Sequence, residues 1–302
     1  MKRHSEISLN AYAKINLTLD ILGVEADGYH GLRSVMQTIS LHDIITVRCG
    51  NPGIHIICSD PRIPSDRRNL AYRAAESYCN ATGIAPEIEI ILDKQIPNQA
   101  GLGGGSSDAA AVLTALNKIY DEQLIQSVLG SIGAEIGSDV PFFLCGGTAS
   151  AGGRGERIEA LSDIPVHHFV LVKPRFGIST AWAYRRLDEM RNYGMAAISP
   201  ISGTCAMVEC INAGDWDRLP SLLMNDLEEP SIERHPMIGD IKRRMIQLGA
   251  RGVLMCGSGS AAFGIFGSND EAVNASSMLT EYGDVYIVYT IPRNTADSGF
   301  VR

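Results

Sequence analysis

The chain has 302 residues, of which 45% are hydrophobic and 20% charged, with 31 glycines and 13 prolines. This is the composition of a globular protein, and the length suits one large domain or two of ordinary size. The formal net charge of −8 argues against nucleic acid or an anionic membrane as the main partner.

The seven cysteines form no Cys-x-x-Cys pair, and several lie inside apolar runs, as at Cys58 and Cys256. This pattern is typical of buried free thiols in a reducing compartment. The first residues are not followed by the apolar run of a secretory signal, and no apolar stretch approaches the ~20 residues of a membrane span. We therefore expect a cytoplasmic protein.

The first element predicted along the chain is a strand over residues 14–21, where polar and apolar residues alternate strictly. A period of two places Lys14 and Asn16 on the same polar face of that strand. Glycine spacing then indicates a loop around residues 25–31. Further strands are predicted at residues 44–48, 54–58 and 87–92, with a helix at residues 69–80.

The second half of the chain mixes predicted strands with predicted helices. The strands are at residues 169–173, 252–255, 262–266 and 285–291, and the helices at residues 180–190, 204–212, 231–248 and 269–282. Residues 158–165 have the pattern of a connector. We therefore expect two domains, residues 1–162 and residues 163–302.

A glycine-rich segment at residues 101–108 leads into an amphipathic helix that ends near Ile119. Four of the five residues 101–105 are glycine, which favours a backbone that must approach a ligand closely. We expect Ser106, Ser107 or Asp108 to cap the helix. The N–H groups at the start of such a helix form an anion site without cationic side chains, suited to phosphates. The alternative is a flexible connector.

Known phosphate-loop patterns do not fit this segment. No lysine in the chain is followed by serine or threonine, as the P-loop requires, and Ser106 stands where the dinucleotide fingerprint has its third glycine. The protein-kinase signatures His-Arg-Asp and Asp-Phe-Gly are also absent from the sequence.

Two further motifs leave alternatives open when taken alone. The segment Gly-Ser-Asp-Val-Pro at residues 137–141 contains Asp139, which either shapes a turn or takes part in chemistry. The segment Gly-Ser-Gly-Ser at residues 257–260 lies between two apolar strands, as a tight turn or as a wall near the phosphates.

Together these motifs resemble those of the GHMP kinases. They recur in order at residues 14–17, 28–40, 100–110, 137–143, 225–228 (Asn-Asp-Leu-Glu) and 257–260, so the resemblance covers residues 10 to 291. Asp-Gly-Tyr-His at residues 27–30 with Gln-Thr-Ile at residues 37–39 is most similar to the members that phosphorylate the 2-hydroxyl of a cytidyl-diphosphate methylerythritol in non-mevalonate isoprenoid synthesis. The resemblance implies an α+β fold with a ribosomal-protein-S5-like N-terminal domain, a ferredoxin-like C-terminal domain and an active site between them.

The resemblance also implies roles around the acceptor. Asp139 would take the proton from the substrate hydroxyl, and Lys14 would keep that carboxylate ionised and offset developing negative charge. Asn16 would orient the acceptor hydroxyl or Asp139. Recognition of the cytosine would fall to Tyr29 and His30, with Tyr184 on the other face of the ring and Thr180 nearby.

The other implied roles concern ATP, which Mg²⁺ should accompany. The residues expected to bind the nucleotide and its phosphates are Lys94, Asn69, Gly101, Leu102, Gly103, Gly104, Gly105, Ser106 and Ser107. The metal ligands are unknown, with Ser107 as a candidate. A small cytidyl-diphosphate substrate is the expected partner, with no nucleic acid or membrane, and the chain would be a monomer or weak homodimer.

Two departures from the family pattern concern the glycine segments. Ala261 follows Ser260 where the family usually has threonine, and Asn98-Gln99 replaces a small or Met-Gly pair. The alternatives are a GHMP kinase for mevalonate, homoserine or a sugar, a silent nucleotide-binding protein, and a nucleic-acid binder. The last conflicts with the net charge.

Overall fold

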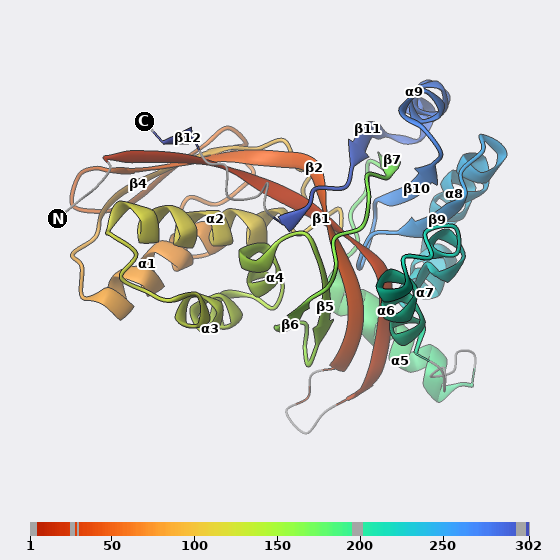
Figure 1. Cartoon of the computed structure of the whole chain (residues 1–302), viewed down its shortest axis with the longest axis horizontal. Helices are drawn as coiled ribbons and strands as arrows, with labels where there is room; N and C mark the ends of the chain where they lie inside the picture. Colours follow the sequence, from red (N-terminus) through yellow and green to blue (C-terminus); the bar gives the residue numbers. More distant parts are fainter. Residues whose placement is uncertain (1–4, 25–27, 29, 195–201, 294–299, 302) are drawn as a thin grey trace.

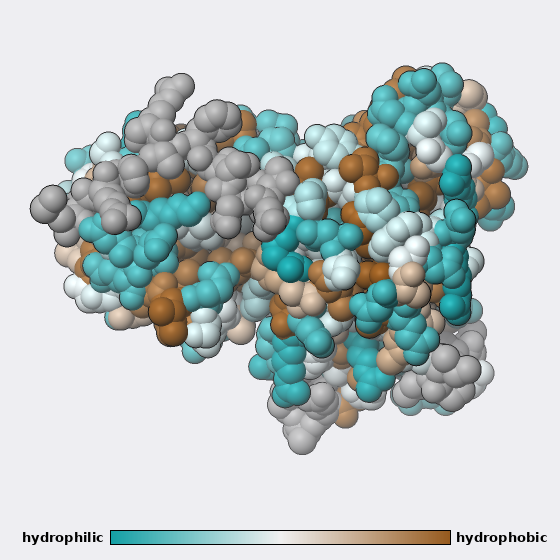
Figure 2. Space-filling view, viewed as in Figure 1, coloured by the Kyte–Doolittle hydropathy of each residue, from teal (hydrophilic) through white to brown (hydrophobic). Residues whose placement is uncertain are grey.

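A computed structural model describes residues 5–24, 28, 30–194 and 202–293 and the backbone of residues 300–301 (Figure 1). The described residues form two sheets with helices packed against them. On the face shown in Figure 2, hydrophilic and hydrophobic residues are interspersed over both parts of the molecule. No helix in these ranges combines the length and the apolar character needed to cross a bilayer.

The larger sheet has eight strands among the described residues, in the order β12-β1-β2-β4-β3, with β5 and β6 continuing beside β2 and β8 beside β1. Its strands are β1 (Glu6–Val24), β2 (His30–Cys49), β3 (Gly53–Cys58), β4 (Glu87–Asp93), β5 (Thr148–Gly152), β6 (Arg157–Ala160), β8 (Met224–Asn225) and β12 (Phe300–Val301).

Four helices cover one face of this sheet in the part of the chain described before β5 (Figure 1). They are α1 (Leu70–Thr82), α2 (Gly104–Ile119), α3 (Gln126–Ile136) and α4 (Val140–Cys145). Their apolar faces bury a core with the inner side chains of β1, β2 and β4. Asn69 begins α1 as its N-cap, with its side-chain oxygen accepting the N–H of Ala71 at 2.9 Å.

The smaller sheet has the order β11-β7-β10-β9, all antiparallel. Its strands are β7 (His168–Lys173), β9 (Gly252–Met255), β10 (Ala262–Phe266) and β11 (Asp284–Tyr289). The helices of this half are α5 (Thr180–Asn192), α6 (Gly203–Ala213), α7 (Glu228–Arg234), α8 (Met237–Gln247) and α9 (Asn269–Ser277), with the 3₁₀ turns η1 (Leu219–Leu222) and η2 (Thr280–Tyr282).

The long strand β1 connects the two halves. Its register with β2 places Lys14 opposite Thr38 and Asn16 opposite Met36, and β8 pairs with it in parallel at Thr18 and Leu19. A shared apolar core joins β1 and β2 to β7, β10 and α6. The proposed division between residues 162 and 163 falls between β6 and β7.

Most of the predicted elements are present, with three kinds of difference. Strands β9 and β10 have the predicted bounds, whereas β1 and β2 extend well beyond the predicted segments, and α3, α4, β5 and β6 were not predicted. The helix predicted over residues 231–248 is in fact two helices, separated by His235 and Pro236, because a proline restricts the residue before it to extended conformations. The seven cysteines are free, as predicted, but only Cys79, Cys210 and Cys256 are buried, whereas Cys49, Cys58 and Cys145 are partly buried and Cys205 is exposed.

Candidate active site

A cavity of about 1470 Å³ lies where the two halves meet. Its walls come from β1, from the segment that leads into α2, from the start of α4, from the start of α5 and from the turn between β9 and β10. The residues predicted for the site that line it are Lys14, Asn16, His30, Asn69, Lys94, Gly101, Leu102, Gly103, Gly104, Gly105, Ser106, Asp139, Thr180 and Tyr184. Tyr29 lies outside the described residues.

The glycine segment folds as a tight loop ahead of α2. Gly101 and Gly103 have positive φ angles of 79° and 74°. A Cβ atom at Gly101 would lie 1.9 Å from the carbonyl oxygen of Cys256, and one at Gly103 would lie 2.6 Å from the ring of Phe143. Side chains are therefore excluded at both positions by neighbouring atoms as well as by the backbone. The N–H of Lys14 donates to the carbonyl of Leu102 at 3.0 Å, which ties the loop to β1.

Helix α2 has no side-chain cap, contrary to the prediction that Ser106, Ser107 or Asp108 would supply one. Its N-cap is Gly103, and the helix begins earlier, at Gly104. The Ser107 hydroxyl donates to the carbonyl of Tyr12 at 2.7 Å, away from the cavity. The first N–H groups of a helix have no partner within it, and the residues that carry them here, Gly104, Gly105 and Ser106, line the cavity.

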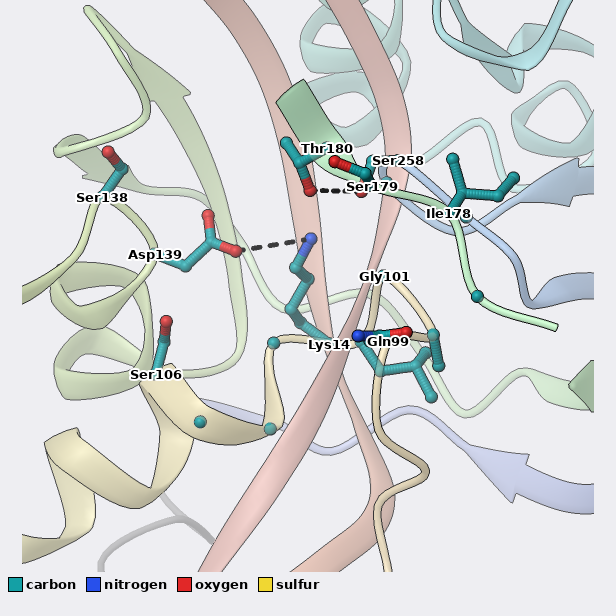
Figure 3. Close-up of a pocket in the computed structure, with 18 of the residues that line it drawn as sticks. Lys14, Gln99, Gly101, Ser106, Ser138, Asp139, Ile178, Ser179, Thr180 and Ser258 are labelled. Carbon is teal, nitrogen blue, oxygen red and sulfur yellow. Dashed lines mark hydrogen bonds and ion pairs between the residues drawn. The ribbon is translucent and has the colours of Figure 1, made fainter. Parts of the chain in front are cut away.

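Lys14 and Asp139 meet in the middle of the cavity (Figure 3). The Lys14 ammonium lies 3.7 Å from Oδ2 of Asp139 and donates a hydrogen bond of 2.7 Å to Oδ1 of Asn16. Asn16 in turn donates to the Ser34 hydroxyl at 2.8 Å. Lys14 and Asn16 are buried, whereas the Asp139 side chain, at the N-terminus of α4, is 37% exposed. A buried cation thus faces a carboxylate that a ligand can reach.

A second group of side chains lies toward the start of α5. The His30 ring lies 5.0 Å from the Tyr184 ring, and its Nε2 is 2.7 Å from Oδ1 of Asp188. Burial, together with the charge of Asp139, raises the pKa of Tyr184 to about 12, so this phenol stays protonated at neutral pH. The Thr180 hydroxyl shares a 2.8 Å hydrogen bond with the Ser258 hydroxyl.

The side chains of Lys94 and Asn69 bond to protein atoms. The Lys94 ammonium donates to Asp43 and, at 2.5 Å, to Asp108, and all three side chains are buried. Burial alone would lower the pKa of Lys94, but the charges of Asp108 and Asp43 outweigh it and raise that pKa. Asn69 caps α1 and also donates to the carbonyl of Pro64 at 2.8 Å. Both residues line the cavity while making these contacts.

Several residues at the cavity were not singled out from the sequence. Ser34 holds Asn16, and Arg234 lies over the ring of Trp182, 4.5 Å from its centroid. Ser34 lies within the family motif at residues 28–40, so the sequence could have indicated that it belongs to the site. No local pattern marks Trp182 and Arg234, because they come from different helices, α5 and α7, that meet only in the fold.

Comparison with known proteins identifies the family. Residues 69–147 match the model of the GHMP kinases N terminal domain, and residues 206–285 match that of the GHMP kinases C terminal. A 4-diphosphocytidyl-2-C-methyl-D-erythritol kinase of Clostridium kluyveri is 40% identical over 287 residues, which cover 94% of this chain and 99% of the relative. The chain belongs to this family of GHMP kinases.

A further relative and a solved structure support the same family assignment. A 4-diphosphocytidyl-2-C-methyl-D-erythritol kinase of Pelotomaculum thermopropionicum is 45% identical over 260 residues, covering 86% of the chain and 88% of the relative. A crystal structure of 4-(cytidine 5'-diphospho)-2C-methyl-D-erythritol kinase superposes with a TM-score of 0.78 at 36% identity, covering 94% of this chain and 98% of that one.

The homoserine kinase of Cytophaga hutchinsonii superposes with a TM-score of 0.75 at 18% identity, covering 97% of each chain. At this identity the match shows a shared fold. The α+β, two-domain GHMP kinase fold that the motifs predicted is thereby confirmed.

Proposed function

We propose that this chain transfers the γ-phosphoryl group of ATP to the 2-hydroxyl of 4-diphosphocytidyl-2-C-methyl-D-erythritol, in non-mevalonate isoprenoid synthesis. The relatives that it matches over nearly their whole length carry that substrate in their names. The observation that carries the mechanism is the pair of Lys14 and Asp139, 3.7 Å apart, in the same cavity as the glycine loop. Phosphoryl transfer depends mainly on positioning and on stabilising charge, and this arrangement supplies both.

In this proposal Asp139 accepts the proton of the acceptor hydroxyl as that oxygen attacks the γ-phosphorus, while the bond from the γ-phosphorus to the β,γ-bridging oxygen breaks and ADP leaves. The Lys14 ammonium stabilises the negative charge that develops on the transferring group. Because Lys14 also bonds to Asn16, its position does not depend on Asp139 alone. Asn16 is fixed by Ser34, so the chain of contacts runs back into the sheet.

The triphosphate would lie against the loop at residues 101–106, where unpaired N–H groups and the positive end of α2 attract it. Mg²⁺ usually keeps several waters and binds to phosphates with one or two protein oxygens. The described residues contain no cluster of three or more His, Cys, Asp or Glu side chains that could hold a metal. Ser107, the candidate ligand from the sequence, does not line the cavity and bonds to Tyr12 instead, so the Ser106 hydroxyl on the cavity wall and the ATP phosphates would hold the ion, which would neutralise phosphate charge.

The cytosine would be recognised at the part of the cavity lined by His30, Tyr184 and Thr180, together with Tyr29, which lies outside the described residues. The tilted contact between His30 and Tyr184 offers an aromatic surface for the base. Asp188 holds His30 in place. We further propose that the protein is cytoplasmic, acts as a monomer or weak homodimer, and binds no nucleic acid.

The test compares acceptors in one assay. ADP release is measured with ATP and Mg²⁺ and, in turn, diphosphocytidyl-methylerythritol, mevalonate, homoserine and galactose. We expect turnover with the first acceptor to exceed the others by orders of magnitude. Preferential turnover of any other acceptor would replace the proposed substrate, and no turnover with any would argue for a nucleotide-binding protein without this activity.

A further inference from the structure

The turn between β9 and β10 fits tightly against the phosphate-binding loop and Lys14. The N–H of Ala261 donates to the carbonyl of Ala100 at 3.3 Å. A Cβ atom at Gly257 would lie 3.1 Å from the carbonyl oxygen of Gly101 and 3.4 Å from both the Lys14 ammonium and Oδ1 of Asn16. A small movement of this turn would therefore displace Gly101 and Lys14 together.

Asn225 holds this turn with its whole side chain. Its amide nitrogen donates to the carbonyls of Met255, at 2.9 Å, and Gly257, at 2.7 Å, while its oxygen accepts the N–H of Leu227 at 2.9 Å. The residue is 8% exposed and forms the end of β8, where it pairs with Leu19 of β1. Asn225 thus joins the strand that carries Lys14, through its backbone, to the turn that packs on the glycine loop, through its side chain.

Glu228, three residues later, holds the other side of the same backbone. Its Oε1 accepts the N–H of Met255 at 2.8 Å, and its Oε2 pairs with Lys242. The Asn-Asp-Leu-Glu segment at residues 225–228, which recurs in the family motif, therefore supplies both a donor and an acceptor to the end of β9.

We propose that Asn225 is a positioning residue for phosphoryl transfer, acting through the turn at residues 257–260 on the glycine loop and Lys14. The inference rests on the proposed function. Asn225 does not line the cavity, so its effect would be indirect. A misplacement of about 1 Å at a reacting centre lowers the rate on the order of 100-fold. Loss of the two hydrogen bonds from Asn225 would let the turn shift, and such a shift would slow phosphoryl transfer.

The substitution Asn225→Asp isolates the donor function. Aspartate has nearly the same shape and keeps an acceptor for the Leu227 N–H, but it loses both N–H donors and places a negative charge against two carbonyls. We expect kcat to fall about 10- to 100-fold and the KM for ATP to rise about 10-fold. The KM for the cytidyl acceptor should change less, by under about 2-fold, because the turn meets α5 at Thr180, through Ser258, and not at the paired rings of His30 and Tyr184.

The matched control is Asn274→Asp, the same change of charge at an exposed position of α9, which should leave all three constants unchanged. A merely structural role for Asn225 would lower the active fraction and hence kcat, without moving either KM. Unchanged KM values in Asn225→Asp would overturn the proposal.

Two further measurements keep the test decisive. Affinity for a non-hydrolysable ATP analogue, measured by calorimetry without acceptor, should fall in Asn225→Asp whichever acceptor the wild type uses, so this result is separable from failure of the proposed function. If Asn225→Asp does not fold, Gly257→Ala perturbs the same turn directly and should raise the KM for ATP more than the KM for the acceptor. Wild-type ATP affinity in Gly257→Ala would contradict the proposal.

Discussion

The Lys14 ammonium lies 3.7 Å from the Asp139 carboxylate, with the lysine side chain 6% exposed and the aspartate side chain 37% exposed. Lys14 belongs to the long strand β1 of the larger sheet, and Asp139 precedes the short helix α4. The cation is therefore rigidly held, while the carboxylate opens onto the cavity and can accept a proton from a bound hydroxyl.

Replacing Asp139 by asparagine tests the base. We expect Asp139→Asn to lower kcat by roughly 10²- to 10⁴-fold, as for loss of a general base, with ATP affinity retained. Steady-state ADP release would measure kcat, and calorimetry with an ATP analogue would measure ATP affinity. Asp217→Asn, at an exposed position, is the control. Normal turnover by Asp139→Asn would exclude it as the base.

The glycine loop is tested by two alanine substitutions at positive φ. Gly101 and Gly83 have φ angles of 79° and 70°, but a Cβ atom at Gly83 would meet nothing within 4 Å. Gly83→Ala should therefore cost only about 1 kcal/mol of unfolding free energy and keep ATP affinity. Gly101→Ala, whose Cβ would overlap the Cys256 carbonyl, should lower ATP affinity more than about 10-fold. Equal ATP affinity in the two variants would count against the loop as the phosphate site.

Tyr184 tests recognition of the base. Stacking of a nucleobase on an aromatic ring is worth about 1–3 kcal/mol, so Tyr184→Ala should raise the KM for the cytidyl acceptor about 10-fold or more. The KM for ATP should stay the same. Tyr193→Ala, which removes a ring that is 78% exposed just beyond the same helix, is the control. The cytosine assignment would have to be withdrawn if the acceptor KM did not change.

The buried carboxylate of Asp108 predicts a pH dependence of stability. Burial raises its pKa to about 7 from a usual value of 3.8, despite the charge of Lys94. A raised folded-state pKa stabilises the protein at low pH, and this contribution is lost as the pH rises through about 7. Urea unfolding of wild type and Asp108→Asn between pH 5 and 8 should show the wild type gaining stability relative to the variant as the pH falls. A constant difference would contradict the assignment.

Lys94→Met is the complementary change. It leaves the carboxylates of Asp43 and Asp108 buried together without the ammonium between them. We expect a loss of about 3–5 kcal/mol of unfolding free energy near pH 8, partly recovered on acidification as one carboxyl takes up a proton. The same urea titrations would measure this change in unfolding free energy. An equally large loss of unfolding free energy at pH 5 would rule out repulsion between the two carboxylates as its cause.

The sequence by itself determined the features that depend on local periodicity and chain connectivity. Strict alternation placed Lys14 and Asn16 on one face, and their 2.7 Å hydrogen bond confirms it. The family motifs predicted the two-domain fold, and glycines ahead of an amphipathic run predicted a loop opening onto a helix. These inferences succeed because neighbours along a strand or helix have fixed directions whatever surrounds them.

The tertiary structure alone decided which distant atoms meet. Glycine is required at Gly101 because of the Cys256 carbonyl, and Lys94 is surrounded by Asp43 and Asp108 rather than left free. Asn225 reaches the turn between β9 and β10 from β8, which pairs with β1. No local pattern encodes such contacts, since they depend on how separate elements pack, and a buried charge or amide acquires its role from the partners that packing provides.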